Sequence, residues 1–156
     1  MVIVSIQVPG VSARTLERFA ARTRRAVKLK GTVSIRVTSS REMRQLNRRF
    51  RRKDKATDVL SFPAGNHFSE LSAGDLAISA QIAAANARRM GHSISKEIKV
   101  LILHGMLHLA GYDHETDNGE MACKEQRLRK SLGLPTALIE RSLASKKSDK
   151  KAGVRP

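Results

Sequence analysis

The sequence predicts an α+β fold, with a small mixed β-sheet packed by several helices in a single domain. Short β-rich segments are mixed with longer stretches in which apolar residues recur at helical spacing, and residues 57–79 are expected to contain a β-hairpin. The length of 156 residues fits one domain, and 40% apolar residues suffice for a buried core. We expect this domain to cover residues 1–143.

The N-terminal segment predicts a strand and then a basic helix. Residues 2–8 have an alternating pattern and are rich in β-forming residues. Pro9-Gly10 follows them, which is typical of a strand that ends in a turn. Ser12 is expected to cap a helix that has an apolar inner face and arginines on its other faces. The predicted inner face consists of Leu16, Phe19, Ala20, Thr23 and Val27.

Residues 32–55 predict a second strand, at 32–38, and a second helix. Ser39 and Glu42 have the spacing of a capping box, and Met43, Leu46 and Phe50 are expected to face inward. Eight of the fifteen residues at 41–55 are basic. This cluster would either hold a phosphodiester or form a solvated helix face.

The remaining chain predicts two further strands and three further helices. The strands are at 57–62, which Pro63 stops, and at 75–79, with a loop at 63–72 between them. An alanine-rich helix is expected to end at Met90 with Gly91 as its cap, and another spans about 94–110 before Gly111. The last predicted helix starts at Asp117 or Asn118 and buries Met121, Leu128 and Leu132.

The composition indicates a polyanionic partner. Lys and Arg number 30 against 14 Asp and Glu, which gives a formal net charge of +16 and predicts attraction to nucleic acid, ribosome or an anionic membrane. Aromatic residues make up only 3%, with no Trp. The chain therefore has few side chains on which bases could stack, and contacts to phosphate are expected to dominate nucleic-acid binding.

Several features predict a cytoplasmic protein. The single Cys123 excludes an intramolecular disulfide and a cysteine-based zinc site, and it suits a reducing compartment. We expect no signal peptide and no membrane span, because the apolar runs are too short. Apolar periodicity is lost from residue 144, so 144–156 is predicted to be a basic, flexible tail, either a solvated end or a binding arm.

Three of the five histidines lie within eleven residues and predict a metal site. His104 and His108 are four residues apart, so on a helix they share one face. A turn at Gly111 would return His114 to the same point. Three neutral imidazoles with an open fourth position are the ligand set of a catalytic zinc, for which hydrolysis is the natural reaction class. His67 and His92 lack such neighbours and are expected to be ordinary surface or loop residues.

The same histidine spacing also matches the ligand frame of metzincin proteases. Those enzymes carry a glutamate as general base directly after the first histidine, and Gly105 stands at this position. Peptide hydrolysis by the usual route is therefore disfavoured. Asp113 is a candidate either to orient a ligand imidazole or to cap a turn, and the sequence favours neither.

Three segments together closely resemble the YbeY family of bacterial endoribonucleases and ribosomal RNA maturation factors. They are the sequence from His104 to His114, Leu46-Asn-Arg-Arg-Phe-Arg51 and Thr57-Asp-Val-Leu-Ser-Phe-Pro63. The resemblance covers about residues 1–140. Ala56 departs from it, because a proline is usual at that position, and the basic tail lies outside the family core.

The resemblance implies a metal-dependent, single-strand-specific ribonuclease that acts in maturation of the 3′ end of small-subunit ribosomal RNA and in ribosome quality control. It implies that His104, His108 and His114 bind zinc and that Arg51 is the functional arginine. An inward-pointing Arg51 would stabilise charge that develops on the scissile phosphate. The partners would be single-stranded RNA, ribosomal RNA and the small ribosomal subunit. Two competing hypotheses are a metalloprotease and a non-catalytic, basic ribosome-binding factor.

Overall fold

The structure, a computed structural model, describes residues 1–64, 72–135, 138–139 and 141. Four strands and five helices occur in these residues. In chain order they are β1 (Val2–Val4), α1 (Ala13–Val27), β2 (Thr32–Thr38), α2 (Ser40–Arg51), β3 (Val59–Pro63), β4 (Ser72–Ser79), α3 (Ala80–Met90), α4 (Ile94–Leu109) and α5 (Glu120–Ser131). The predicted tail at 144–156 and His67 lie outside the described residues.

The strands form one mixed sheet in the order β1-β2-β4-β3. β1, β2 and β4 are parallel, whereas β3 pairs antiparallel with β4, so the hairpin predicted within 57–79 is present. Its register pairs Phe62 with Asp75 and Leu60 with Ala77. β3 is therefore one edge of the sheet, and this edge lies beside the histidine-bearing helix.

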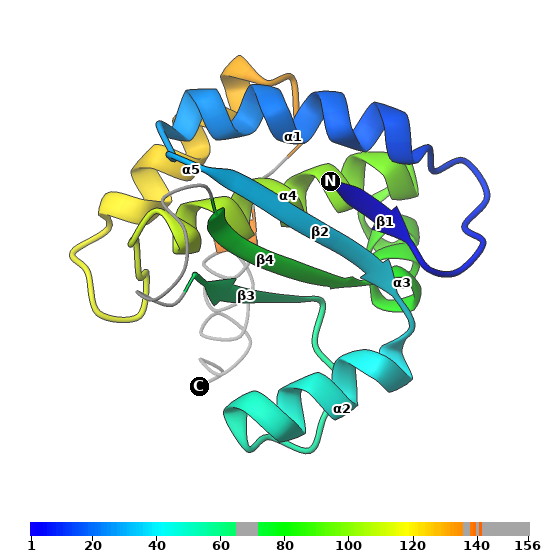
Figure 1. The fold of residues 1–156 in the computed structure, drawn as a ribbon. Coiled ribbons are helices and arrows are strands. Elements are labelled where there is room, and N and C mark those ends of the chain that lie inside the picture. The colour runs from blue at the N-terminus through cyan, green and yellow to red at the C-terminus, as the bar shows by residue number, and fades with distance from the viewer. Residues whose placement is uncertain (65–71, 136–137, 140, 142–156) are drawn as a thin grey trace, which may run out of the picture.

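The two faces of the sheet have different coverings (Figure 1). α4 lies behind the sheet in this view, contacts β3 and β4, and also packs against α1, α3 and α5. The main core on this side includes Ile35, Leu76 and Leu101, none more than 1% exposed. The opposite face carries a small cluster in which Met43 of α2 contacts Leu60 and Ala77.

Serine side chains start four of the helices. Ser12, Ser39, Ser79 and Ser93 each accept a hydrogen bond from a backbone N–H of the first turn, which satisfies one of the donors that a helix N-terminus leaves free. Gly91 ends α3 in the left-handed conformation, at φ 73°, as the sequence predicts. Ser93 thus fixes the start of α4, the helix that carries His104 and His108.

The predictions for the four elements β1, α2, β4 and α5 differ from the structure, and β4 starts at Ser72 rather than at residue 75, because its pairing with β2 begins there. β1 ends at Val4 rather than at residue 8, because β2, its only neighbour in the sheet, ends at Thr38, one residue beyond the partner of Val4. Phe50 is 56% exposed rather than inward-facing, because α2 buries only Met43 and Asn47. α5 begins at Glu120, preceded by a turn that Asp117 caps.

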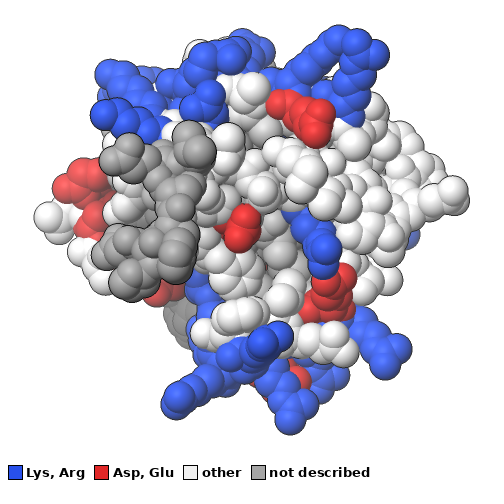
Figure 2. Space-filling model, viewed as in Figure 1, with Lys and Arg blue, Asp and Glu red and all other residues white. Residues whose placement is uncertain are grey.

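Basic side chains gather above and below the open face of the sheet (Figure 2). All eight basic residues at 41–55 are exposed, and those of α2 lie below this face, while arginines of α1 lie above it. None of the helices in the described residues is long and apolar enough to span a bilayer.

Candidate metal centre

The helix α4 holds two histidines on a rigid, buried support. Ten of its sixteen residues are buried, and His104 itself is only 5% exposed. His108 follows one turn later and is half-buried. The backbone around both imidazoles is thus held by packing before any ligand binds.

The turn after α4 brings the third histidine back to the first two. Gly111 has φ 97°, a conformation that favours glycine, and its N–H donates to the carbonyl of His108 at 3.0 Å. The Tyr112 N–H donates to the carbonyl of Leu107 at 3.1 Å, which closes the turn. His114 is exposed at the end of this turn. The predicted glycine hinge is therefore confirmed.

The three imidazoles form one cluster. One ring nitrogen from each of His104, His108 and His114 lies within 4.8 Å of the other two. The Nε2 atoms of His104 and His108 are 3.2 Å apart. This separation is close to the roughly 3.3 Å expected between two nitrogens that bind one tetrahedral zinc with Zn–N bonds of about 2.05 Å.

Hydrogen bonds at the opposite ring nitrogens fix two tautomers. His104 Nδ1 lies 2.8 Å from Glu125 Oε2, and His108 Nδ1 lies 2.9 Å from the carbonyl oxygen of Tyr112. Because a carboxylate and a carbonyl only accept, both Nδ1 atoms carry the proton in the neutral rings. The lone pairs of the two Nε2 atoms then face each other without a proton between them, and a shared cation satisfies both. The donor set fits a metal ion.

Glu125 is the site residue that sequence reasoning missed. It is 0% exposed, and its other oxygen accepts from the backbone N–H of Ile139 at 3.3 Å. Asp113, the carboxylate that the sequence offered for this role, instead accepts from the backbone N–H of Glu115 at 3.0 Å and caps the turn. The position of Glu125 on α5 requires a long-range contact between α4 and α5 that spacing does not reveal.

The environment of His108 favours the neutral ring that binds metal. Burial lowers the pKa of His108 below its usual value, and the neighbouring His104 lowers this pKa further, while the hydrogen bond to Tyr112 opposes the shift. The lone pair of His108 is thus available at a lower pH than in a solvated imidazole.

Close packing explains why a glycine, Gly105, directly follows the first histidine of α4. A Cβ atom at Gly105 would lie 2.7 Å from Cδ2 of Leu76 and 3.3 Å from Oγ of Ser61. The Ser61 hydroxyl also donates to the Gly105 carbonyl at 3.2 Å. This position therefore packs against the β3–β4 hairpin, and it provides no carboxylate of the kind that the protease mechanism requires.

Arg51 makes no described contact with the histidine cluster. It is exposed at the last position of α2, and no hydrogen bond or ion pair of the described chain joins it to the three histidines. The neighbouring Arg52 is in the left-handed region, at φ 56°, and the N–H of Lys53 donates to the Asn47 carbonyl at 3.3 Å. The role of Arg51 therefore remains a proposal.

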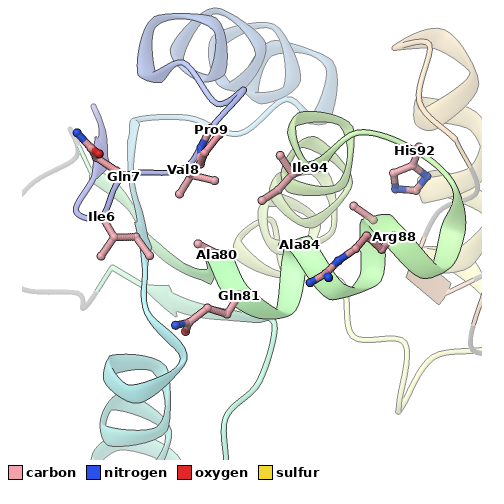
Figure 3. Close-up of a pocket in the computed structure, with 11 residues that line it drawn as sticks. Ile6, Gln7, Val8, Pro9, Ala80, Gln81, Ala84, Arg88, His92 and Ile94 are labelled. Atoms are coloured by element: carbon pink, nitrogen blue, oxygen red, sulfur yellow. The ribbon is translucent and has the colours of Figure 1, made fainter.

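His92 is not an ordinary surface residue. Its Nε2 lies 2.7 Å from Glu97 Oε1, and the two side chains are only 9% and 0% exposed. Arg141 Nη1 contacts the other carboxylate oxygen at 2.8 Å. His92 also lines a groove of about 510 Å³ between residues 6–9 and α3, which is separate from the three-histidine cluster (Figure 3).

The fold and the cluster define a small α+β protein with three convergent imidazoles, and comparison with known proteins gives its family. The profile described as Endoribonuclease YbeY matches residues 7–133. Endoribonuclease YbeY of Koribacter versatilis is 54% identical over 142 residues, which are 91% of each chain. That of Solibacter usitatus is 53% identical over 126 residues, 81% of this chain and 83% of the relative.

Similarity to a solved structure agrees with the sequence comparisons. A solution structure of a protein from Thermotoga maritima is 26% identical, has a TM-score of 0.57, and covers 100% of this chain and 98% of its own. The chain belongs to the YbeY endoribonuclease family.

Proposed function

We propose that this protein is a zinc-dependent, single-strand-specific endoribonuclease that acts on the 3′ end of small-subunit ribosomal RNA. The convergence of His104, His108 and His114 on one point carries this proposal. The relatives are named endoribonucleases, and the exposed basic residues of 41–55 provide a surface that attracts a polyanion.

The chain's own residues prepare the metal site. His104 and His108 present their Nε2 lone pairs, while Glu125 and the Tyr112 carbonyl hold the Nδ1 protons. The carboxylate of Glu125 also makes the His104 ring a stronger donor to a cation. A zinc ion held by these three imidazoles would supply Lewis acidity toward a phosphoryl oxygen and would make water more acidic near neutral pH.

Arg51 and the basic residues near it have the role of binding the phosphate backbone. An arginine guanidinium donates two parallel hydrogen bonds to a phosphate, and this geometry stabilises charge that develops during cleavage. The exposed position of Arg51 leaves its guanidinium available to RNA. The general base is unassigned, because Gly105 replaces the protease glutamate.

The biological setting follows from the same proposal. Ribosomal RNA within the small ribosomal subunit would be the substrate, processing and ribosome quality control the roles, and the cytoplasm the compartment. The net charge of +16 supports a nucleic-acid partner, and a single cysteine suits a reducing compartment.

The test compares three substrates with the zinc-loaded protein. We expect cleavage of end-labelled single-stranded RNA, and no cleavage of its duplex or of casein. Arg51→Ala should lower the RNA cleavage rate about 10–100-fold, because one donor to the developing charge is lost. Arg89→Ala, which removes an exposed arginine of α3 that bonds only Asn86 among the described contacts, is the matched control.

The outcomes distinguish the competing functions. Casein cleavage without RNA cleavage would identify a metalloprotease, and stoichiometric zinc with neither activity would indicate a non-catalytic factor. An RNA cleavage rate that is equal in the wild type and Arg51→Ala would remove the role proposed for Arg51. Purifying all variants identically controls for contaminating ribonuclease.

A further inference from the structure

A groove lies on the open face of the sheet, opposite the face that α4 covers. Its volume is about 450 Å³, and side chains of all four strands and of α2 line it. Three of the four large hydrophobic residues that are exposed in the described chain belong to this groove: Met1, Ile3 and Phe50, at 69%, 40% and 56%. Exposed apolar residues gathered at one place indicate a binding site rather than chance.

Aromatic rings form one wall of the groove. Phe50 of α2 and Phe62 of β3 meet edge to face, with ring centroids 5.3 Å apart and planes at 67°. The guanidinium carbon of Arg49 lies 5.3 Å from the centroid of the Phe50 ring. An exposed aromatic ring beside an arginine is the combination on which unpaired bases stack.

The charges around the groove favour a base inside it and phosphates at its rim. Asp75 lines the interior, where its carboxylate repels phosphate but accepts from the N–H groups of a base. Arg36, the basic residue of the lining, is already paired with Glu42 at 2.9 Å. The exposed arginines of α2 lie outside, below the open face in Figure 2.

The edge strand β3 lies between the groove and the histidine-bearing helix and contacts both. Consecutive strand residues project to opposite faces, so Phe62 faces the groove while Ser61 faces α4. The Ser61 hydroxyl bonds the Gly105 carbonyl, next to His104. A strand of RNA that passes over the β3 edge would therefore reach both places.

We propose that this groove is a nucleobase subsite, in which an unpaired base near the scissile phosphodiester stacks on the exposed ring of Phe50, and Phe62, edge to face with that ring, forms the adjoining wall. The proposal rests on the proposed function in taking single-stranded RNA as the substrate. The low aromatic content predicts that phosphate contacts dominate RNA binding. The proposal adds base stacking to those contacts. It also explains a preference for single strands, because a paired base has no free face to stack.

The test measures binding without cleavage. A fluorescent single-stranded RNA and an abasic oligomer of equal length and charge are titrated with wild-type protein and Phe50→Ala in the presence of a chelator. We expect Phe50→Ala to weaken RNA binding about 5–10-fold, from the loss of one stacking contact, and to leave binding of the abasic oligomer unchanged. Met90→Ala, which removes a residue 38% exposed at the end of α3, should behave as wild type.

Three results would overturn the proposal. They are equal RNA affinity of the wild type and Phe50→Ala, an equal loss for RNA and for the abasic oligomer, and a dimer in sedimentation that Phe50→Ala dissolves. The last result would assign the groove to a second copy of the chain. Failure of the zinc-loaded protein to cleave RNA would overturn the proposed function alone, because this measurement does not depend on cleavage.

Discussion

The helices α4 and α2 pack against opposite faces of the β3–β4 hairpin and differ in almost every other respect. Ten of the sixteen residues of α4 are buried, against two of the twelve residues of α2. α4 presents imidazoles that packing holds in place, whereas α2 presents exposed arginines and one exposed aromatic ring.

The difference separates two kinds of recognition. A metal ion requires donor atoms fixed to within a fraction of an ångström, which a buried helix provides. A flexible polyanion tolerates mobile side chains, because its charge attracts them from many directions. Substitutions near α4 should therefore change metal affinity or folding, and substitutions of the exposed residues of α2 should change RNA binding alone.

The largest expected effect is that of His114→Ala. Loss of one of three ligands should lower zinc affinity by more than about 100-fold, which exceeds the effect expected of an outer hydrogen-bond partner. The free energy of unfolding should change by less than about 0.5 kcal/mol, because His114 is exposed. Competition with a colorimetric chelator measures the affinity, and Glu115→Ala in the same turn is the control. Unchanged zinc affinity would exclude His114 as a ligand.

Glu125→Gln should lower zinc affinity about 10–100-fold. The amide keeps the volume, and its one oxygen can still accept the Nδ1 proton of His104, but it lacks the negative charge that strengthens the ring as a donor. Its NH2 group cannot accept from the Ile139 N–H, so one hydrogen bond is also lost. The same chelator competition measures this effect, and denaturant unfolding of the zinc-free protein reports any loss of stability. Wild-type zinc affinity in this variant would reduce Glu125 to a packing role.

Gly105→Ala should destabilise the protein by about 1–3 kcal/mol. The added Cβ would meet Leu76 Cδ2 at 2.7 Å, so the helix or the strand must shift. Denaturant unfolding gives the value, and a double-mutant cycle with Leu76→Val tests whether this contact is the cause. A single variant as stable as the wild type would mean that α4 and β4 have room to move apart.

The stability of the metal-free protein should decrease as the pH falls below about 6.5, the pKa of an unfolded histidine. Because the pKa of His108 is lowered in the fold, the unfolded state binds the proton first, and stability present above pH 6.5 is lost toward the folded pKa. The slope for one proton is at most about 1.4 kcal/mol per pH unit, and the partial exposure of the ring reduces it.

Unfolding curves from pH 7 to 5 measure this dependence, with His108→Gln as the comparison. The variant should lose the part of the slope that His108 contributes. Identical pH dependence in the two proteins would contradict the assignment. Lowered carboxylate pKa values, such as that of Glu42 beside Thr38, act only at lower pH.

The smallest effect is expected on α2. Arg49→Ala should change the free energy of unfolding by less than about 0.5 kcal/mol, because the side chain is exposed. The same variant should weaken RNA binding, measured by fluorescence anisotropy, and the loss should shrink as salt is raised. A large loss of stability would show that α2 supports the fold as α4 does.

The features that the sequence predicts well are those with local causes. The capping residues Ser12 and Ser39, the turn at Gly111 and the shared face of His104 and His108 all depend on neighbours within a few residues. The helix boundaries follow from the same local hydrogen bonds. The histidine cluster is therefore predictable in most of its geometry, because two of the histidines share a helix and the third follows a glycine turn.

The features that the sequence misses depend on contacts between distant elements. Glu125 reaches His104 across 21 residues, and a glutamate in a polar helix carries no local sign of this contact. Phe50 has the spacing of an inward residue, yet only Met43 and Asn47 of α2 are fully buried, with Leu46 partly buried beside them. The side of α2 that packs on the sheet is decided by the assembled sheet. The groove has the same origin, because residues of all four strands and of α2 line it.

The carboxylate of Glu125 connects the first histidine to the end of the described chain. One oxygen holds the imidazole of His104, and the other holds the backbone N–H of Ile139. Two residues further on, Arg141 is tied to Glu97 in the first turn of α4. Ile139 and Arg141 thus tie the last described residues to α4 at two places, in its first turn through Glu97 and beside His104 through Glu125, so a change in these contacts would also change the support of the His104 ring.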